Sequence, residues 1–226
     1  MTPHSVQRVE HTKWNELMYL ARQLDHTIGT SLVPEGCRFI AMLTTIGSQV
    51  ELALQLPSDP MAKLMVSDAT LEGLGTYLSS ANTVHNHAKK LVKKSERYLR
   101  AKHASTSASI TAALAEHDAE PLNAFVHSLS DFFRHDHTPN NIHFGTRVVV
   151  QNGVTTSFEL VASLGLGGLR DQWVPKTPQY EMAIAYAAAH DPIEIKPMVE
   201  DHLMSTSRLV TTVNRSIRDE FGRSRT

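Results

Sequence analysis

Cysteine is almost absent from this chain, because Cys37 is the only one among 226 residues. A single thiol excludes an internal disulfide and a thiolate metal cage. An excess of one charge is absent too: 22 lysines and arginines face 23 acidic residues, for a formal net charge of -1. Affinity for nucleic acid or an anionic membrane would therefore require a local basic patch. No apolar run reaches the length of a membrane span, and the polar start does not resemble a signal peptide. We therefore expect a cytoplasmic protein that does not enter a membrane.

Apolar residues recur at helical spacing along most of the chain, which is 41% hydrophobic and 20% charged. That composition is ordinary for a globular protein, and the length suits one domain over residues 1–226. The pattern predicts helices over about 11–28, 39–54, 68–103, 121–133, 180–190 and 199–221. We expect the Val33-Pro34-Glu35-Gly36 stretch to separate the first two helices. Pro121 is placed as a first-turn proline that opens the fourth.

One segment has a different texture and predicts a β-hairpin. Residues 146–151 and 154–161 are rich in β-branched side chains and flank the dipeptide Asn152-Gly153. That dipeptide favours the tight primed turn of a two-residue hairpin loop. A lone hairpin is only marginally stable in water, so this one should lie against helices. The predicted fold is mainly α, a helical bundle with one inserted β-hairpin over about 146–161.

A basic stripe runs along the third predicted helix. Lys89, Lys93, Arg97 and Arg100 share one face at helical spacing, while Leu91 and Leu99 lie off that face and are expected in the core. Such a stripe is suited to contacts with the phosphates of RNA. The alternative is an ordinary solvated helix face, which is what most charge runs are.

Histidine is unusually frequent, with 13 in the chain, and three of them lie close together in sequence. His135, His137 and His143 offer imidazole ligands suited to zinc or nickel. No recognised metal motif such as H-E-x-x-H is present, and the spacing would require a site in a loop. We therefore rank a metal-dependent hydrolase built on these three residues last, and expect no metal or other cofactor.

The segment from Leu129 to Pro139, Leu-Ser-Asp-Phe-Phe-Arg-His-Asp-His-Thr-Pro, resembles the end of the signature helix of HEPN-like (higher eukaryotes and prokaryotes nucleotide-binding) proteins. That family has an Arg-Asn pair followed by a histidine, and one uncharacterised branch has a trailing proline. In this register Ser130 stands in place of the arginine, Asp131 in place of the asparagine, and His135 in place of the histidine. The resemblance covers about the last half of the chain.

The resemblance implies a helical homodimer that acts on RNA, as in toxins and defence effectors. His135 would be the acid or base that moves the 2′-hydroxyl proton, with Asp131 and Arg134 as orienting or phosphate-facing neighbours. Loss of a charge-stabilising group commonly costs about two to three orders of magnitude in rate. Since Ser130 replaces the family arginine, the resemblance implies a weak, metal-independent RNase or a protein that only binds RNA.

A second hypothesis comes from a different class of protein. His135 also fits the C-terminal end of a helix, where the helix dipole favours cations by about 0.3–1 kcal/mol. With the histidines incidental, the chain would be a non-catalytic helical interaction module whose partner the sequence does not identify.

Overall fold

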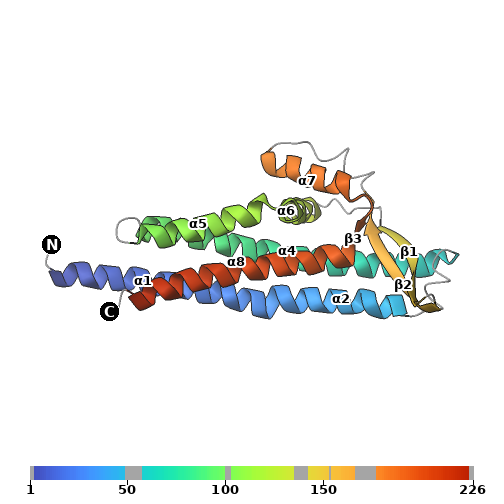
Figure 1. The fold of residues 1–226 in the computed structure, drawn as a ribbon, viewed down its shortest axis with the longest axis horizontal. Coiled ribbons are helices and arrows are strands. Elements are labelled where there is room, and N and C mark those ends of the chain that lie inside the picture. Colours follow the sequence, from blue (N-terminus) through green and yellow to red (C-terminus); the bar gives the residue numbers. More distant parts are fainter. Residues whose placement is uncertain are drawn as a thin grey trace.

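The fold is mainly α, as the sequence predicts: long helices lie side by side and a small β-sheet sits at one end of the bundle (Figure 1). We describe it from a computed structural model. The structure describes residues 3–48, 58–99, 103–134, 142–152, 154–165 and 177–223. Among these residues, no helix is both long enough and apolar enough to cross a membrane.

The first two predicted helices form one continuous rod, contrary to our expectation of a break. Helix α1 (Pro3–Thr27) leads through a π-helical turn, η1 (Ile28–Leu32), directly into α2 (Val33–Ser48). The amide of Val33 donates to the carbonyl of Ile28, five residues back. A π turn commonly accommodates a local irregularity inside a helix. Pro34 therefore lies in the first turn of α2, where a missing amide is tolerated, and does not end the rod.

Three further helices begin where local signals place them. Helix α4 (Pro60–Tyr98) starts after Asp59, whose side chain accepts hydrogen bonds from the amides of Met61 and Ala62. Helix α5 (Ala104–Ala119) follows the expected turn, and α6 (Pro121–Arg134) opens with its predicted proline. The corner between α5 and α6 is only one residue long, which places the end of one helix beside the start of the next.

The predicted hairpin is confirmed and is longer than expected. Strands β1 (Ile142–Gln151) and β2 (Val154–Leu164) pair antiparallel, and Asn152 adopts a positive φ of 52° in the loop. A two-residue strand, β3 (Ile193–Glu194), adds to β2 and was not predicted. Helix α7 (Pro178–Ala189) packs on α6, and α8 (Ile195–Arg223) runs back along the whole bundle.

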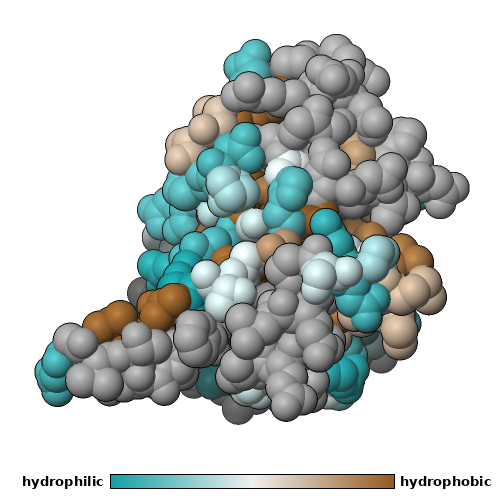
Figure 2. All heavy atoms as spheres, turned by 90° about the vertical axis from the view of Figure 1, so that its right-hand side faces the viewer, coloured by the Kyte–Doolittle hydropathy of each residue, from teal (hydrophilic) through white to brown (hydrophobic). Residues whose placement is uncertain are grey.

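The core lies between α1, α4, α5, α6 and α8, where leucines such as Leu17, Leu74 and Leu129 are fully buried. Helices α2 and α4 approach closely, since a Cβ on Gly73 would lie 2.6 Å from the Phe39 ring. Some large apolar side chains stay exposed in the first turns of α4 and on β1: Met61, Leu64, Met65, Val148 and Val150. Hydrophobic residues reach the surface at the hairpin end of the molecule (Figure 2).

Candidate metal centre

Four histidines from four different helices meet inside the bundle. His85 on α4, His117 on α5, His127 on α6 and His202 on α8 are 5%, 5%, 6% and 1% exposed. The His85 and His127 rings are 3.9 Å apart between centroids; His117 lies about 6 Å from each of the other three rings, and His127 lies 6.0 Å from His202. Histidine is more often partly exposed, so four buried imidazoles in mutual contact require an explanation.

Each histidine is buried because it falls on the core face of its helix. A buried apolar residue lies three positions before it in three cases: Leu114 before His117, Ala124 before His127, and Val199 before His202. His85 follows Ala81 by four positions. Residues three or four apart share one face of a helix, so the same pattern that buries the leucines also buries these imidazoles.

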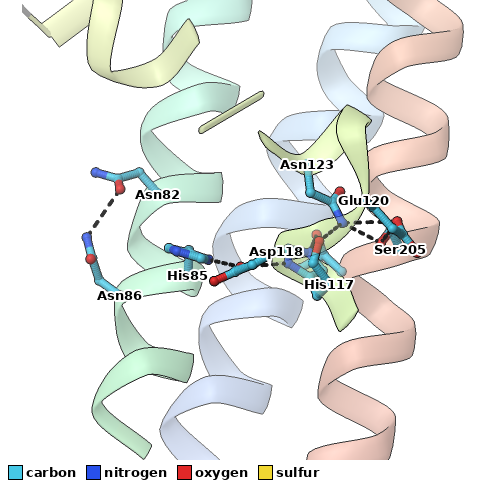
Figure 3. Close-up of polar contacts among 9 residues, drawn as sticks. Asn82, His85, Asn86, His117, Asp118, Glu120, Asn123 and Ser205 are labelled. Carbon is cyan, nitrogen blue, oxygen red and sulfur yellow. Dashed lines mark hydrogen bonds and ion pairs between the residues drawn. The ribbon is translucent and has the colours of Figure 1, made fainter. Parts of the chain in front are cut away.

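Asp118 brings a carboxylate to this group at the end of α5. Its Oδ1 lies 3.5 Å from Nδ1 of His85 and 3.5 Å from Nδ1 of His117 (Figure 3). One donor atom from each of His85, His117, Asp118 and His127 lies within 4.8 Å of the others. A metal with ligands at about 2.1 Å and tetrahedral angles holds neighbouring donors about 3.4 Å apart. The two spacings from Asp118 match this value, and the other donor atoms lie within 4.8 Å of one another.

Several ring nitrogens in this cluster have no hydrogen-bond partner. Within the described part of the chain, Nδ1 of His85, both nitrogens of His127 and Nε2 of His202 are buried and unbonded. A buried polar group without a partner costs about 1–3 kcal/mol by mutational measures. Native cores therefore contain few such groups, and each one calls for a reason. A metal ion would satisfy the lone pairs that protein groups leave free.

The histidines that lack partners are held in their neutral form. Burial, together with the nearby charge of Lys89, lowers the pKa of His85 from 6.5 to about 3. Burial likewise holds the pKa of His127 and of His202 well below the ordinary value, and neighbouring histidines add to the effect. Metal ligation requires a neutral imidazole. These residues therefore need not lose a proton near neutral pH before they bind a metal.

Hydrogen bonds hold the α5–α6 corner that carries two of the ligands. The Asn123 amide nitrogen donates to the carbonyl of His117 at 2.7 Å, to Ser205 Oγ at 2.9 Å and to Glu120 Oε2 at 3.0 Å (Figure 3). The Ser205 hydroxyl also donates to Glu120 at 2.6 Å. On the ring itself, Nε2 of His117 lies 3.4 Å from Thr206 Oγ1. Contacts of this kind orient metal-binding histidines in known sites and leave the other ring nitrogen for the ion.

His202 has a separate set of contacts. Its Nδ1 lies 2.6 Å from the hydroxyl of Tyr77, and that hydroxyl is 3.4 Å from the carbonyl oxygen of Val199. The rings of Tyr77 and His202 stand nearly perpendicular, at 86°. Both residues are buried, and burial raises the pKa of Tyr77, so its hydroxyl keeps its proton.

The site is closed on most sides and reaches the surface at two places. The Asp118 side chain is 37% exposed. A groove of about 500 Å³ between α5 and α8 has His117 and Ser205 in its wall, together with Arg208 and Arg215. Of the cluster's residues, Asp118 is therefore the partly exposed one, and His117 borders the groove.

The residues named by the family resemblance lie elsewhere. Asp131 and Arg134 form an exposed ion pair with each other near the end of α6. Ser130 is buried, and its hydroxyl donates to the carbonyl of Leu78 at 3.1 Å, so it belongs to the core. His135 and His137 fall outside the described residues, and His143 is exposed on β1. Among the described residues, the structure brings Asp131 and Arg134 together, and it does not describe where His135 and His137 lie.

The basic stripe is placed as predicted where it is described. Lys89, Lys93 and Arg97 are exposed on α4, while Leu91 and Leu99 are buried. Arg100 lies outside the described residues. The stripe begins with Lys89, one helical turn after His85, so the charge of Lys89 lies close to the candidate metal centre.

Sequence reasoning missed the buried histidines because it looked for ligands close together in the chain. His85 and His87 stand out as a pair in sequence, yet His87 turns away and its Nδ1 lies 3.1 Å from Thr27 Oγ1. The available signal was local: His127 falls among Phe125, Val126 and Leu129 in an apolar stripe. That signal indicates burial but not which other helices supply ligands.

Comparisons with known proteins do not identify a relative for this arrangement. No family model, no curated protein and no solved structure matches the chain.

Proposed function

We propose that this protein binds one first-row transition metal ion in its core, through His85, His117, Asp118 and His127. The observation that carries the proposal is His127: both of its ring nitrogens are buried without a hydrogen bond among the described residues, beside two more imidazoles and a carboxylate. A core histidine kept only for packing would form a hydrogen bond with at least one ring nitrogen. Otherwise an apolar residue at that position would avoid the cost of burying the unbonded nitrogens.

The donor set favours zinc among the common ions. Three imidazoles and one carboxylate form a nitrogen-rich, four-donor site, which suits zinc, copper, iron or nickel better than calcium or magnesium. The two donor spacings of 3.5 Å from Asp118 and the lack of thiolate ligands at the site agree with a histidine–carboxylate zinc centre. The supply of metals in the cell also decides which ion occupies the site. The identity of the metal is therefore an outcome of the experiment below.

The test is metal content and affinity in untagged protein. Protein prepared with zinc and then passed through a desalting column is expected to retain about one ion per chain, measured by plasma mass spectrometry. His127→Ala should lose it. His26→Ala is the matched control, because His26 is exposed on α1 and is not one of the four proposed ligands. Wild-type protein without a metal, or equal retention by both variants, would refute the proposal.

An RNA-directed role is a second candidate, and the exposed stripe of Lys89, Lys93 and Arg97 supports it. We propose it on that stripe and on the HEPN-like segment around His135, with a homodimer as the active form. Replacing the three cations by glutamine should weaken RNA binding and reduce the slope of log K against log salt by about 2 to 3. The control replaces three exposed cations elsewhere, Arg22, Arg38 and Lys63.

Cleavage is tested separately from binding. A mixed RNA pool is incubated with wild-type protein and with His135→Ala in the presence of a chelator, because the family resemblance implies chemistry without a metal. Cleavage lost only in the variant would support a nuclease. If neither cleavage nor stripe-dependent binding is found, the non-catalytic interaction module becomes the better hypothesis for this part of the molecule.

A further inference from the structure

We propose that the metal in this centre takes a fifth, exchangeable ligand, a small anion with an oxygen donor such as hydroxide or a carboxylate, and that Nε2 of His202 donates a hydrogen bond to that oxygen. This inference rests on the proposed metal function and extends it, because it assigns a ligand-binding position to a residue outside the metal ligands.

His202 lies just beyond the metal ligands. It is not among the residues whose donor atoms all lie within 4.8 Å of one another. Its ring centroid is 6.2 Å from that of His117 and 6.0 Å from that of His127, and it meets the two rings at 66° and 82°. An oxygen bound to a metal at about 2.1 Å and hydrogen-bonded at about 2.9 Å puts the hydrogen-bond donor within about 5 Å of the metal. A ring that lies next to the ligand rings can make this contact. His202 is therefore placed to contact a group on the metal and not the metal itself.

We infer which nitrogen of His202 carries the proton from its contact with Tyr77. A phenol hydroxyl has one proton, and Nδ1 of His202 at 2.6 Å is a much nearer acceptor than the Val199 carbonyl at 3.4 Å. With Nδ1 accepting from Tyr77, the neutral ring has its proton on Nε2. The two nitrogens of an imidazole point in nearly opposite directions, so this N–H is directed away from Tyr77.

That N–H has no acceptor within the described part of the chain, although it is fully buried. A metal-bound water is a poor acceptor because its lone pair is committed to the metal. A metal-bound hydroxide or carboxylate keeps lone pairs free and carries the negative charge that strengthens the bond. A buried N–H without an acceptor therefore favours an anion as the metal-bound group.

The route to the site is compatible with such a ligand. The groove between α5 and α8 reaches His117 and has the cations Arg208 and Arg215 in its wall. The acidic residues there are Glu116 and Glu120, and Glu120 already accepts from Ser205 and Asn123. A volume of about 500 Å³ admits a small anion without rearrangement of the helices.

The experiment uses cobalt-loaded full-length protein and sodium formate as the probe, at constant ionic strength. The visible absorption of cobalt reports both metal binding and a change of ligand. Formate should shift the wild-type spectrum with saturation. His202→Phe and Tyr77→Phe should each weaken formate binding about tenfold or more, the worth of one hydrogen bond to a charged group. Cobalt affinity should change little. Tyr19→Phe, which removes an exposed hydroxyl on α1, is the control.

The outcomes separate this inference from the metal proposal. If wild-type protein binds no cobalt, the metal proposal itself fails. If cobalt binds but formate leaves the spectrum unchanged, or if both variants bind formate as wild type does, the inference is overturned and the metal centre stands. If His202→Phe loses cobalt and Tyr77→Phe binds formate as the wild type does, His202 is itself a metal ligand. That result would also overturn the inference. Should His202→Phe fail to fold, Tyr77→Phe decides, because it removes only one hydroxyl.

Discussion

Replacing His127 by leucine should make the metal-free protein more stable while it abolishes metal binding. In the absence of metal, His127 buries two ring nitrogens without a hydrogen bond among the described residues and is only 6% exposed. Leucine has a similar volume and no polar atom. The substitution therefore removes a desolvation penalty and keeps most of the packing in the core.

The expected magnitude follows from that penalty. One buried, unsatisfied polar group costs about 1–3 kcal/mol. Leucine is branched and the imidazole ring is flat, so imperfect repacking lowers stability by up to about 1.5 kcal/mol and offsets part of the gain. We therefore expect a net gain of about 1 kcal/mol in the free energy of unfolding. With metal present the order reverses, because an ion at 100 times its dissociation constant stabilises the wild type by about 2.7 kcal/mol and the variant not at all.

The assay is urea unfolding of both proteins in EDTA and again with saturating zinc, followed by circular dichroism. His190→Leu is the control, because His190 is exposed and stacks on Tyr186 outside the cluster. A loss of more than about 2 kcal/mol for His127→Leu in EDTA would refute the reasoning. It would mean that His127 contributes to the stability of the metal-free core and is not held there at a cost.

Three further results are expected. In EDTA, the wild type should lose stability as the pH falls below 6.5. Burial holds the pKa of folded His85 at about 3, whereas the unfolded residue takes up its proton near 6.5. The loss should continue down to about pH 3, and the urea midpoint measures it. Asn123→Ala should cost about 1–3 kcal/mol in urea unfolding, because it removes the donor that joins the α5–α6 corner to α8; a cost near zero would show that the corner does not depend on this donor. Gly73→Ala should lower stability by about 1–3 kcal/mol, since its Cβ would lie 2.6 Å from the Phe39 ring. Gly29→Ala has open space around it and should be neutral or stabilising, and equal effects at the two glycines would contradict the packing argument.

The architecture was predictable where the signal is local. Helical periodicity placed α4, α6 and α8, and Asn152 with the β-branched flanks placed the hairpin, because each element depends on neighbours within a few positions. The break expected at Pro34 was wrong for a related reason. A proline in the first turn of a helix lacks only an amide that needs no partner there, and a π turn joins the two helices without a loop.

The site was not predictable in the same way. Its ligands come from positions 85, 117, 118 and 127, on three helices, and His202 joins from a fourth, so nothing in the local spacing shows that they meet. Of the histidines that stand close together in sequence, His143 is exposed on a strand, and His135 and His137 fall outside the described residues. Proximity in the chain misled because helical geometry turns successive side chains about 100° apart.

Burial distinguishes the two groups of histidines better than their number does. An exposed imidazole is hydrated by water at no cost and gives no reason to expect a ligand. A buried imidazole without a hydrogen bond lowers stability, and substitution by leucine or phenylalanine would remove that cost. His127 keeps both nitrogens in this condition, and His85 and His202 keep one each. His85 and His127 share a cluster with His117 and Asp118, so the metal proposal offers a reason for the cost of their unbonded nitrogens.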